Sequence, residues 1–263
     1  MGKVVHGEMT SKELKKAIEK DTTVILPVGA TEVCGQHCPV GTDHLTAAAA
    51  AKRLGEATRT IVAPTIPVGD SLSLMGYPGT LTVSTDTLYR YVRDICFSLV
   101  ANGFERIFFL NTHVYNAYPI DRVARDLMPK GILSAQVDFW RFMFQFANES
   151  GKVESKKLSV GHGGEINTSV VMSLYPDLVN LPEAVEEIPE PSLQSKYLGK
   201  ITTYRNFSDY SKTGTVGYPA LASEEKGALF LEKGLAYLVQ FIEDFKAEPL
   251  PPMVDPLTKK KEE

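Results

Sequence analysis

The stretch Thr23-Val24-Ile25-Leu26-Pro27 is a short apolar run that ends in a proline, with Gly29 two residues later. A run that is apolar at consecutive positions is typical of a strand buried on both faces, as in parallel sheets. Similar runs occur at 60–63, 106–110 and 134–137. These four segments predict the strands of one sheet.

Helical patterns lie between these runs. They cover the alanine-rich segment 46–57 and the segments 85–102 and 119–128. A further short helix is predicted near the N-terminus, because Thr10 and Glu13 have the spacing of a capping box. Strands that alternate with helices over short connections indicate an α/β fold, in which a parallel sheet carries helices on both faces.

The composition is that of an ordinary globular protein. Of the 263 residues, 43% are hydrophobic and 23% are charged, which excludes a disordered, collagen-like or coiled-coil chain. No apolar run approaches the ~18–20 residues of a membrane-spanning helix. The net charge of −4 gives no basic surface for nucleic acid. The first residues lack the apolar core of a signal peptide, and three cysteines make no disulfide framework, so we expect a cytoplasmic protein.

We expect one domain over residues 1–263. Residues 180–215 are rich in Pro, Glu, Ser and Tyr without a clear period, and we interpret them as a long surface excursion. Residues 250–263 form a tail.

Side chains that bind metals follow the predicted strand ends. Segment 29–44 contains two carboxylates, two histidines and two cysteines, segment 111–116 contains His113, and segment 161–165 contains His162. Loops after parallel strands gather at one edge of the sheet, where such folds bind their ligands. Mixed Glu, Asp, His and Cys ligands suit Zn, Mn or Fe. The sequence therefore predicts a metal site at this edge.

Each of these residues also has a purely structural explanation. Asp43 has the place of an N-cap before the alanine-rich helix, and His113 that of a core histidine. Glu165 is favoured by a helix N-terminus alone. Cys34 and Cys38 lack a second pair to close a structural zinc site, and a cysteine nucleophile paired with histidine is recognised only by geometry. The joint placement of the residues at strand ends is what favours the metal site.

Five ordered segments resemble the creatininase family, that is, creatinine amidohydrolases and their relatives. They are Leu26-Pro27-Val28-Gly29-Ala30-Thr31-Glu32 with Asp43 eleven residues on, Gly76-Tyr77-Pro78-Gly79-Thr80-Leu81, Phe109-Leu110-Asn111-Thr112-His113, His162-Gly163-Gly164-Glu165-Ile166-Asn167-Thr168-Ser169, and Gly217-Tyr218-Pro219-Ala220 through Glu225-Lys226-Gly227. The resemblance implies a three-layer αβα sandwich with a mostly parallel sheet. It also implies a homo-oligomer, often a hexamer, and one or two divalent metal ions per chain.

The resemblance further implies a set of ligands. Residues equivalent to Glu32, Asp43 and His113 hold the first metal in the family, and Asp43 bridges to a second. This chain departs from the family around that second metal: Cys34 stands where the family usually has histidine, and Tyr115 where some members have glutamate. A cysteine thiolate is a legitimate ligand for Zn or Fe(II). Either Cys34 replaces the histidine, or the second site is empty and one metal serves the enzyme.

Two further positions belong to the same comparison. Glu165 matches a carboxylate that other members use near the second metal, and Asn167 stands where the family usually has another glutamate. These departures alter the pocket in which a creatinine ring would lie. They therefore argue against creatinine itself as the substrate.

We predict metal-dependent hydrolysis of a C–N amide-type bond in a small cyclic compound, with zinc as the expected metal and Mn or Fe as alternatives. His162 is the predicted acid–base group, since a histidine has an ordinary pKa near ~6.5. Glu165 either binds the second metal or orients His162, and His37, Tyr115 and Asn116 are expected to contact the substrate. Two alternatives stay open: ring-opening C–C hydrolysis of a cyclic diketone such as a diketo-inositol, and a non-catalytic protein that binds a small molecule.

Overall fold

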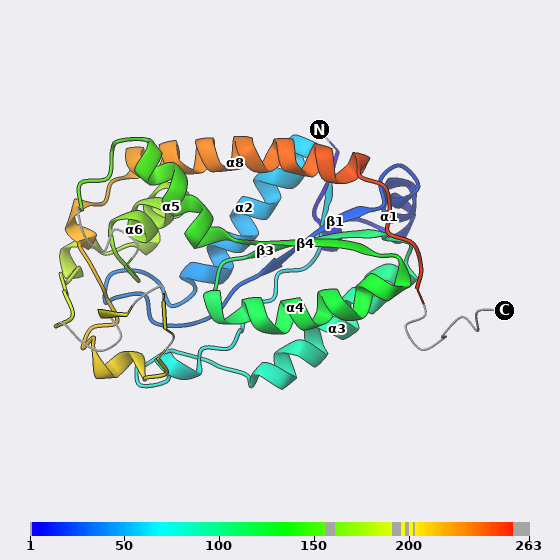
Figure 1. Ribbon diagram of the computed structural model, residues 1–263. Helices are drawn as coiled ribbons and strands as arrows, with labels where there is room; N and C mark the ends of the chain where they lie inside the picture. Colours follow the sequence, from blue (N-terminus) through cyan, green and yellow to red (C-terminus); the bar gives the residue numbers. More distant parts are fainter. Residues whose placement is uncertain (1, 156–160, 191–195, 198–199, 202, 255–263) are drawn as a thin grey trace.

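The computed structural model of the protein describes residues 2–155, 161–190, 196–197, 200–201 and 203–254 (Figure 1). Its strands are β1 (Thr23–Val28), β2 (Ile61–Val62), β3 (Arg106–Asn111) and β4 (Leu133–Asp138). Its α-helices are α1 (Ser11–Ile18), α2 (Thr42–Thr58), α3 (Thr85–Ala101), α4 (Ala117–Leu127), α5 (Phe139–Glu149), α6 (Glu165–Leu174) and α8 (Glu224–Ala247). The predicted capping box is present, because the Thr10 side chain accepts from the amide of Glu13 and the Glu13 carboxylate accepts from that of Thr10.

The strands form one parallel sheet in the order β2-β1-β3-β4. The predicted parallel sheet is therefore confirmed. The strand expected at 60–63 is reduced to the two residues of β2, and β4 is half-buried because it lies at the edge of the sheet. In the register of the sheet Val28 pairs with Asn111, and Asn111 pairs with Asp138. The carboxyl ends of β1, β3 and β4 consequently lie side by side.

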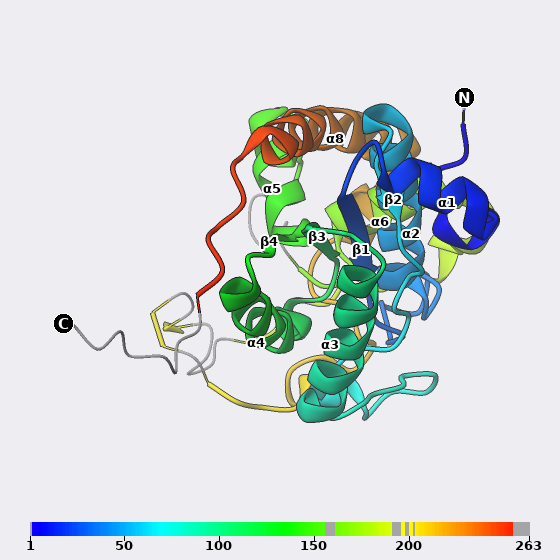
Figure 2. The ribbon, with the colours of Figure 1, turned by 90° about the vertical axis from the view of Figure 1, so that its right-hand side faces the viewer.

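Helices cover both faces of the sheet, which confirms the three-layer α/β arrangement. Helices α2, α5, α6 and α8 lie on one side, and α3 and α4 lie on the other (Figures 1 and 2). Side chains alternate accordingly along the strands. Ile25 and Phe108 pack into the cluster beneath α2 and α8, whereas Leu26 and Phe109 pack into the cluster against α3 and α4. Both faces of the central strands are thus buried, as their apolar runs predict.

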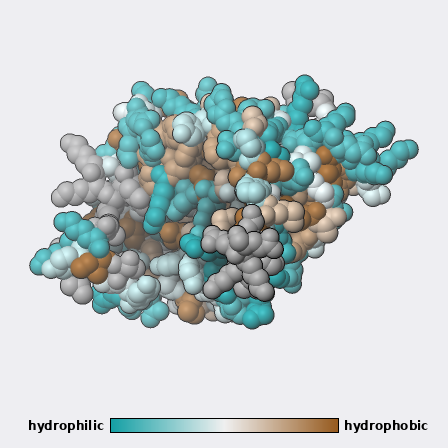
Figure 3. Space-filling model, turned by 45° about the vertical axis from the view of Figure 1, so that its right-hand side comes forward, coloured by the Kyte–Doolittle hydropathy of each residue, from teal (hydrophilic) through white to brown (hydrophobic). Residues whose placement is uncertain are grey.

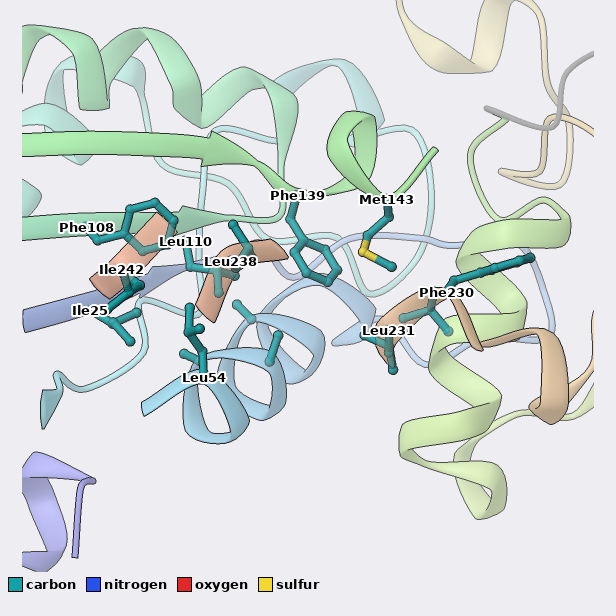
Figure 4. Close-up of a cluster of buried hydrophobic side chains, with 14 of the residues drawn as sticks. Ile25, Leu54, Phe108, Leu110, Phe139, Met143, Phe230, Leu231, Leu238 and Ile242 are labelled. Carbon is teal, nitrogen blue, oxygen red and sulfur yellow. The ribbon is translucent and has the colours of Figure 1, made fainter. Parts of the chain in front are cut away.

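Helix α8 is absent from the sequence prediction, yet it closes one face of the molecule. It packs against α2, α5 and α6, and its Phe230, Leu238 and Ile242 enter the core beside the sheet (Figure 4). The contact with α6 depends on Gly227 near the start of α8. A Cβ atom at that position would lie 1.9 Å from the carbonyl oxygen of Ser169, so a side chain there would force the two helices apart.

The predicted surface excursion at 180–215 falls only partly within the described residues, which here form short 3-10 turns such as Phe207–Asp209. Most of the predicted tail lies beyond residue 254, outside the described residues. No helix in the described part of the chain is long and apolar enough to cross a membrane. On the face drawn in Figure 3, hydrophilic side chains surround smaller hydrophobic patches.

Candidate metal centre

Three predicted ligands meet at the carboxyl edge of the sheet. Glu32 follows β1, Asp43 lies in the first turn of α2, and His113 follows β3. Their ligand atoms all lie within 4.8 Å of one another, and each residue is at least 94% buried, with relative exposures of 3%, 6% and 4%. The close approach of β1 and α2 depends on Gly29, where a Cβ atom would lie 2.4 Å from the Cα atom of His44. The structural alternative for Asp43 is wrong, since the N-cap of α2 is Gly41.

A main-chain contact orients the ring of His113. Its Nε2 atom donates a hydrogen bond to the main-chain oxygen of Asp70 at 2.9 Å. In the neutral imidazole this leaves the lone pair on Nδ1. Nδ1 faces the carboxylates of Glu32 at 3.2 Å and Asp43 at 3.4 Å. A histidine that donates through one nitrogen and presents the other is the usual form of a metal ligand.

The two carboxylates are also held in place. Ser71 Oγ donates to Glu32 Oε2 at 2.5 Å, and Trp140 Nε1 donates to Asp43 Oδ1 at 2.8 Å. Hydrogen bonds of this kind to the ligands fix their orientation before a metal binds.

The two carboxylates dominate the electrostatics of this buried site. Burial opposes a charge on His113, but Glu32 and Asp43 outweigh it and raise its pKa well above the ordinary value. Burial also raises the pKa of Asp43, to which the nearby charge of Glu32 adds. For Glu32 burial acts in the same direction, but His113, His162 and Ser71 lower the pKa overall. Two buried carboxylates that draw a proton onto His113 fit a divalent cation, which would take the place of that proton and compensate their charge.

These residues line a cavity of about 400 Å³, together with His162, Tyr115 and Trp140. A second cavity of about 830 Å³ adjoins it, and Tyr115 lines both. His162 Nε2 donates to the main-chain oxygen of Val33 at 2.6 Å and lies 3.9 Å from Glu32 Oε1. The structure thus brings His162 and Tyr115 to the triad, as predicted.

Cys34 lines the same cavity but does not join the three ligands. Among the described residues, the group with mutually close ligand atoms consists of Glu32, Asp43 and His113 alone. The Cys34 thiol lies beside Cys38, and this neighbour together with burial raises the pKa of Cys34.

Three predicted site residues, Asn116, His37 and Glu165, lie outside the lining of the cavity. Asn116 donates through Nδ2 to the oxygen of Gly29 at 2.9 Å and accepts through Oδ1 from the amide of Asp70 at 3.1 Å. It ties loops together and does not line the cavity. His37 is 2% exposed and contacts Thr168 Oγ1 at 2.9 Å through Nε2. The structure therefore places Asn116 and His37 outside the lining of the cavity, away from the substrate contacts predicted for them.

Glu165 also lies away from the cavity. It is fully buried, and its carboxylate binds Lys226 Nζ at 2.8 Å and the amide of Ser155 at 2.8 Å. The structure shows no contact between Glu165 and His162 or the triad among the described residues, so neither role predicted for this carboxylate is supported by its position.

Three contributors to the centre are missing from the sequence prediction. Trp140 and Ser71 bind the ligand carboxylates, and the main chain of Asp70 binds His113. The sequence does point to Trp140, because it is the only tryptophan of the chain and follows a predicted strand end. The contacts of Ser71 and of the Asp70 main chain carry no such signal in the sequence.

Comparison with known proteins agrees with this geometry. The sequence matches the family described as creatininase, creatinine amidohydrolase, over residues 7–242. It is 32% identical to the creatinine amidohydrolase of Pseudomonas putida, over 95% of this chain and 98% of that protein. It is 26% identical to the 3-dehydro-scyllo-inosose hydrolase of Thermotoga maritima, over 93% of this chain and 85% of that protein.

Solved structures give the same result. A mutant creatininase of Zn-Zn type superposes with a TM-score of 0.81 at 28% identity, covering 96% of this chain and 100% of that chain. A manganese creatininase superposes with a TM-score of 0.79 at 28% identity, covering 95% of this chain and 100% of that chain. With the family match over most of its length and the buried triad in place, this chain belongs to the creatininase family.

Proposed function

We propose that this protein is a divalent-metal-dependent hydrolase that cleaves a C–N amide-type bond in a small, cyclic substrate. The observation that carries the proposal is the buried triad of Glu32, Asp43 and His113 in the wall of a cavity of about 400 Å³. Cavities of this size suit small molecules. The family of the chain supports the same class of reaction.

Glu32, Asp43 and His113 would hold the metal, and zinc is the ion we propose, with manganese as the alternative. The Zn-Zn and manganese forms of related creatininases support this choice. When bound, a divalent metal lowers the pKa of a coordinated water towards ~7 and polarises the carbonyl group of the substrate.

His162 is the residue we assign to proton transfer. Its hydrogen bond to the oxygen of Val33 fixes the proton on Nε2. Nδ1 is then the basic nitrogen, and it takes up a proton or releases one to the leaving nitrogen of the substrate. The side chain of His162 is 25% exposed and lines the cavity, so a substrate can reach it.

One alternative reaction has its own support. The similarity to a 3-dehydro-scyllo-inosose hydrolase extends over 93% of this chain, and the polar side chains of Tyr115, Asp138 and Arg141 line the cavity. Such a lining suits a hydroxylated ring. Ring-opening C–C hydrolysis of a cyclic diketone, from which an enolate leaves, is therefore the second candidate. The predicted homo-oligomer and the cytoplasmic location stay predictions.

The test is hydrolysis by the metal-loaded protein of four compound classes: cyclic amides including creatinine, formamides, short peptides and cyclic β-diketones. We expect turnover of a C–N bond in a cyclic amide other than creatinine, and Glu32→Gln should lose both metal and activity while its circular dichroism is unchanged. Turnover of the diketone alone would select the second candidate. Binding of a compound without turnover, unchanged in Glu32→Gln, would make the protein a binding protein and overturn the proposal.

A further inference from the structure

We propose that each chain binds a single metal ion, and that Trp140 keeps the site mononuclear by holding the outer oxygen of Asp43. The inference rests on the proposed metal-dependent function and states how many ions serve it. It departs from the related creatininase of Zn-Zn type.

The two oxygens of Asp43 have different environments. Oδ2 faces His113 Nδ1 at 3.4 Å and belongs to the triad. Oδ1 accepts a hydrogen bond from Trp140 Nε1 at 2.8 Å. A carboxylate that bridges two ions presents one oxygen to each of them. Trp140 occupies the approach to Oδ1. Because the indole N–H is a donor without a lone pair, Trp140 cannot itself be a ligand of a second ion.

A second ion would also need ligands of its own, and among the described residues no second group of three His, Cys, Asp or Glu ligand atoms lies close together. Outside the triad, the metal-binding side chains that line the cavity are Cys34, Asp138 and His162, to which Asn167 adds only a neutral amide. Cys34 lies beside Cys38, and Asp138 lies 3.3 Å from Arg141 Nε. His162 donates to Val33 through Nε2, which leaves it one nitrogen, Nδ1, and a single histidine nitrogen does not make a second site.

The carboxylate at the start of α6 gives no ligand either. Glu165 binds Lys226 at 2.8 Å and does not line the cavity. Tyr115 does line it, but its single hydroxyl oxygen is a poor substitute for the two oxygens of a carboxylate. The donor set therefore fits one ion in the triad and leaves a second ion without the three protein ligands that such sites have.

The chain provides its own reporter for a test. Trp140 is the only tryptophan in the sequence, and it touches a ligand of the proposed ion. We would add Co²⁺ to metal-free protein and follow tryptophan fluorescence and cobalt absorption together, with elemental analysis after desalting. We expect all three to saturate at one equivalent, in wild type and in Cys34→Ala, without the thiolate-to-cobalt charge-transfer absorption that a cysteine ligand would produce.

The outcomes distinguish failure of the mononuclear site from failure of the proposed hydrolase function. Two equivalents in the wild type would overturn the mononuclear site and leave the hydrolase intact. A thiolate band that Cys34→Ala removes would overturn the exclusion of Cys34 from the ligands. No binding of Co²⁺, Zn²⁺ or Mn²⁺ would overturn the proposed function itself.

Trp140→Phe tests the part assigned to the indole, because it keeps an aromatic ring and removes the N–H group. We expect a second, weaker equivalent of Co²⁺ by absorption and elemental analysis. Phe144→Leu, on the same helix and in the same cavity wall, is the matched control and should keep one equivalent. A single equivalent in folded Trp140→Phe, as judged by circular dichroism, would show that Trp140 does not exclude a second ion.

Discussion

The carboxylate of Glu165 and the ammonium group of Lys226 form an ion pair at 2.8 Å that joins the first turns of α6 and α8. Lys226 also binds Glu154 Oε1 at 2.6 Å and the oxygen of Leu221 at 2.7 Å. Glu165 accepts from the amide of Ser155 at 2.8 Å. This network fastens both helices to the segment that precedes His162 in the chain. Glu165 therefore has a structural role.

Removal of Lys226 should therefore destabilise the fold. Lys226→Met leaves the buried carboxylate of Glu165 without its cation, and a broken buried pair costs about 3 kcal/mol or more of unfolding free energy. Urea denaturation followed by circular dichroism measures this. Lys233→Met, at an exposed position of the same helix, is the control and should change the free energy by less than about 0.5 kcal/mol. Equal stability of the two variants would contradict the structural part given to the pair.

Metal removal should lower the melting temperature. Because the ion binds the folded chain through Glu32, Asp43 and His113, it should stabilise that state by ~3 kcal/mol when free metal exceeds Kd by about 100-fold. Scanning calorimetry of the metal-loaded and chelated protein tests this. In Glu32→Gln the two curves should coincide. A metal-dependent shift that persists in this variant would place the ion at another site.

His162→Gln should separate catalysis from metal binding. The variant loses the proton-transfer group, which typically costs about 100-fold or more in kcat. His162 is not part of the triad, so the metal content by elemental analysis should stay at the wild-type value. Loss of metal together with activity would show that His162 is a ligand, contrary to the role we assign to it.

The pH dependence of stability should include a contribution from Glu187. Burial raises its pKa, but hydrogen bonds from Thr213, Lys212 and Ser211 outweigh this and lower the pKa overall. A carboxyl with a depressed pKa in the folded state stabilises the fold above its unfolded pKa of about 4.3, and this contribution is lost as the pH falls through the folded value. Glu187→Gln should therefore be less stable than the wild type at neutral pH.

That difference should shrink as the solution is acidified below about pH 4. Urea titrations of both proteins over this range measure it. Glu190→Gln, at an exposed position nearby, is the control and should follow the wild type throughout. A difference between Glu187→Gln and wild type that does not change with pH would contradict the assignment.

The sequence predicts that Glu32, Asp43 and His113 come together because they follow the ends of predicted strands, and the parallel register brings those ends side by side. Glu32 and His113 emerge from neighbouring strands, with Val28 paired to Asn111. The predicted parallel sheet with helices on both faces is also confirmed. Helix α8 is missing from the prediction, although Phe230, Leu238 and Ile242 recur at helical spacing.

The residues that the structure places away from the cavity have a side-chain type that suits a site, but their hydrogen bonds are made elsewhere. Asn116 binds two main-chain groups, and Glu165 binds Lys226, which stands 61 residues farther along the chain. Contacts between residues so distant in sequence depend on the packing of whole elements. Trp140 shows the opposite: it contacts a ligand of the centre but is missing from the prediction. Its contact with Asp43 requires the start of α5 to lie against the start of α2, which no local pattern shows.

The acceptor that orients His113 is a main-chain oxygen, that of Asp70. Every amino acid at position 70 carries such an oxygen, so replacement of the Asp70 side chain leaves the acceptor in place as long as the loop keeps its path. The orientation of the imidazole ring is therefore preserved when residue 70 is substituted. The partners of Glu32 and Asp43 are side chains, and a single substitution can remove either of them. Under mutational drift, this centre should keep its histidine geometry longest and change first at Ser71 and Trp140.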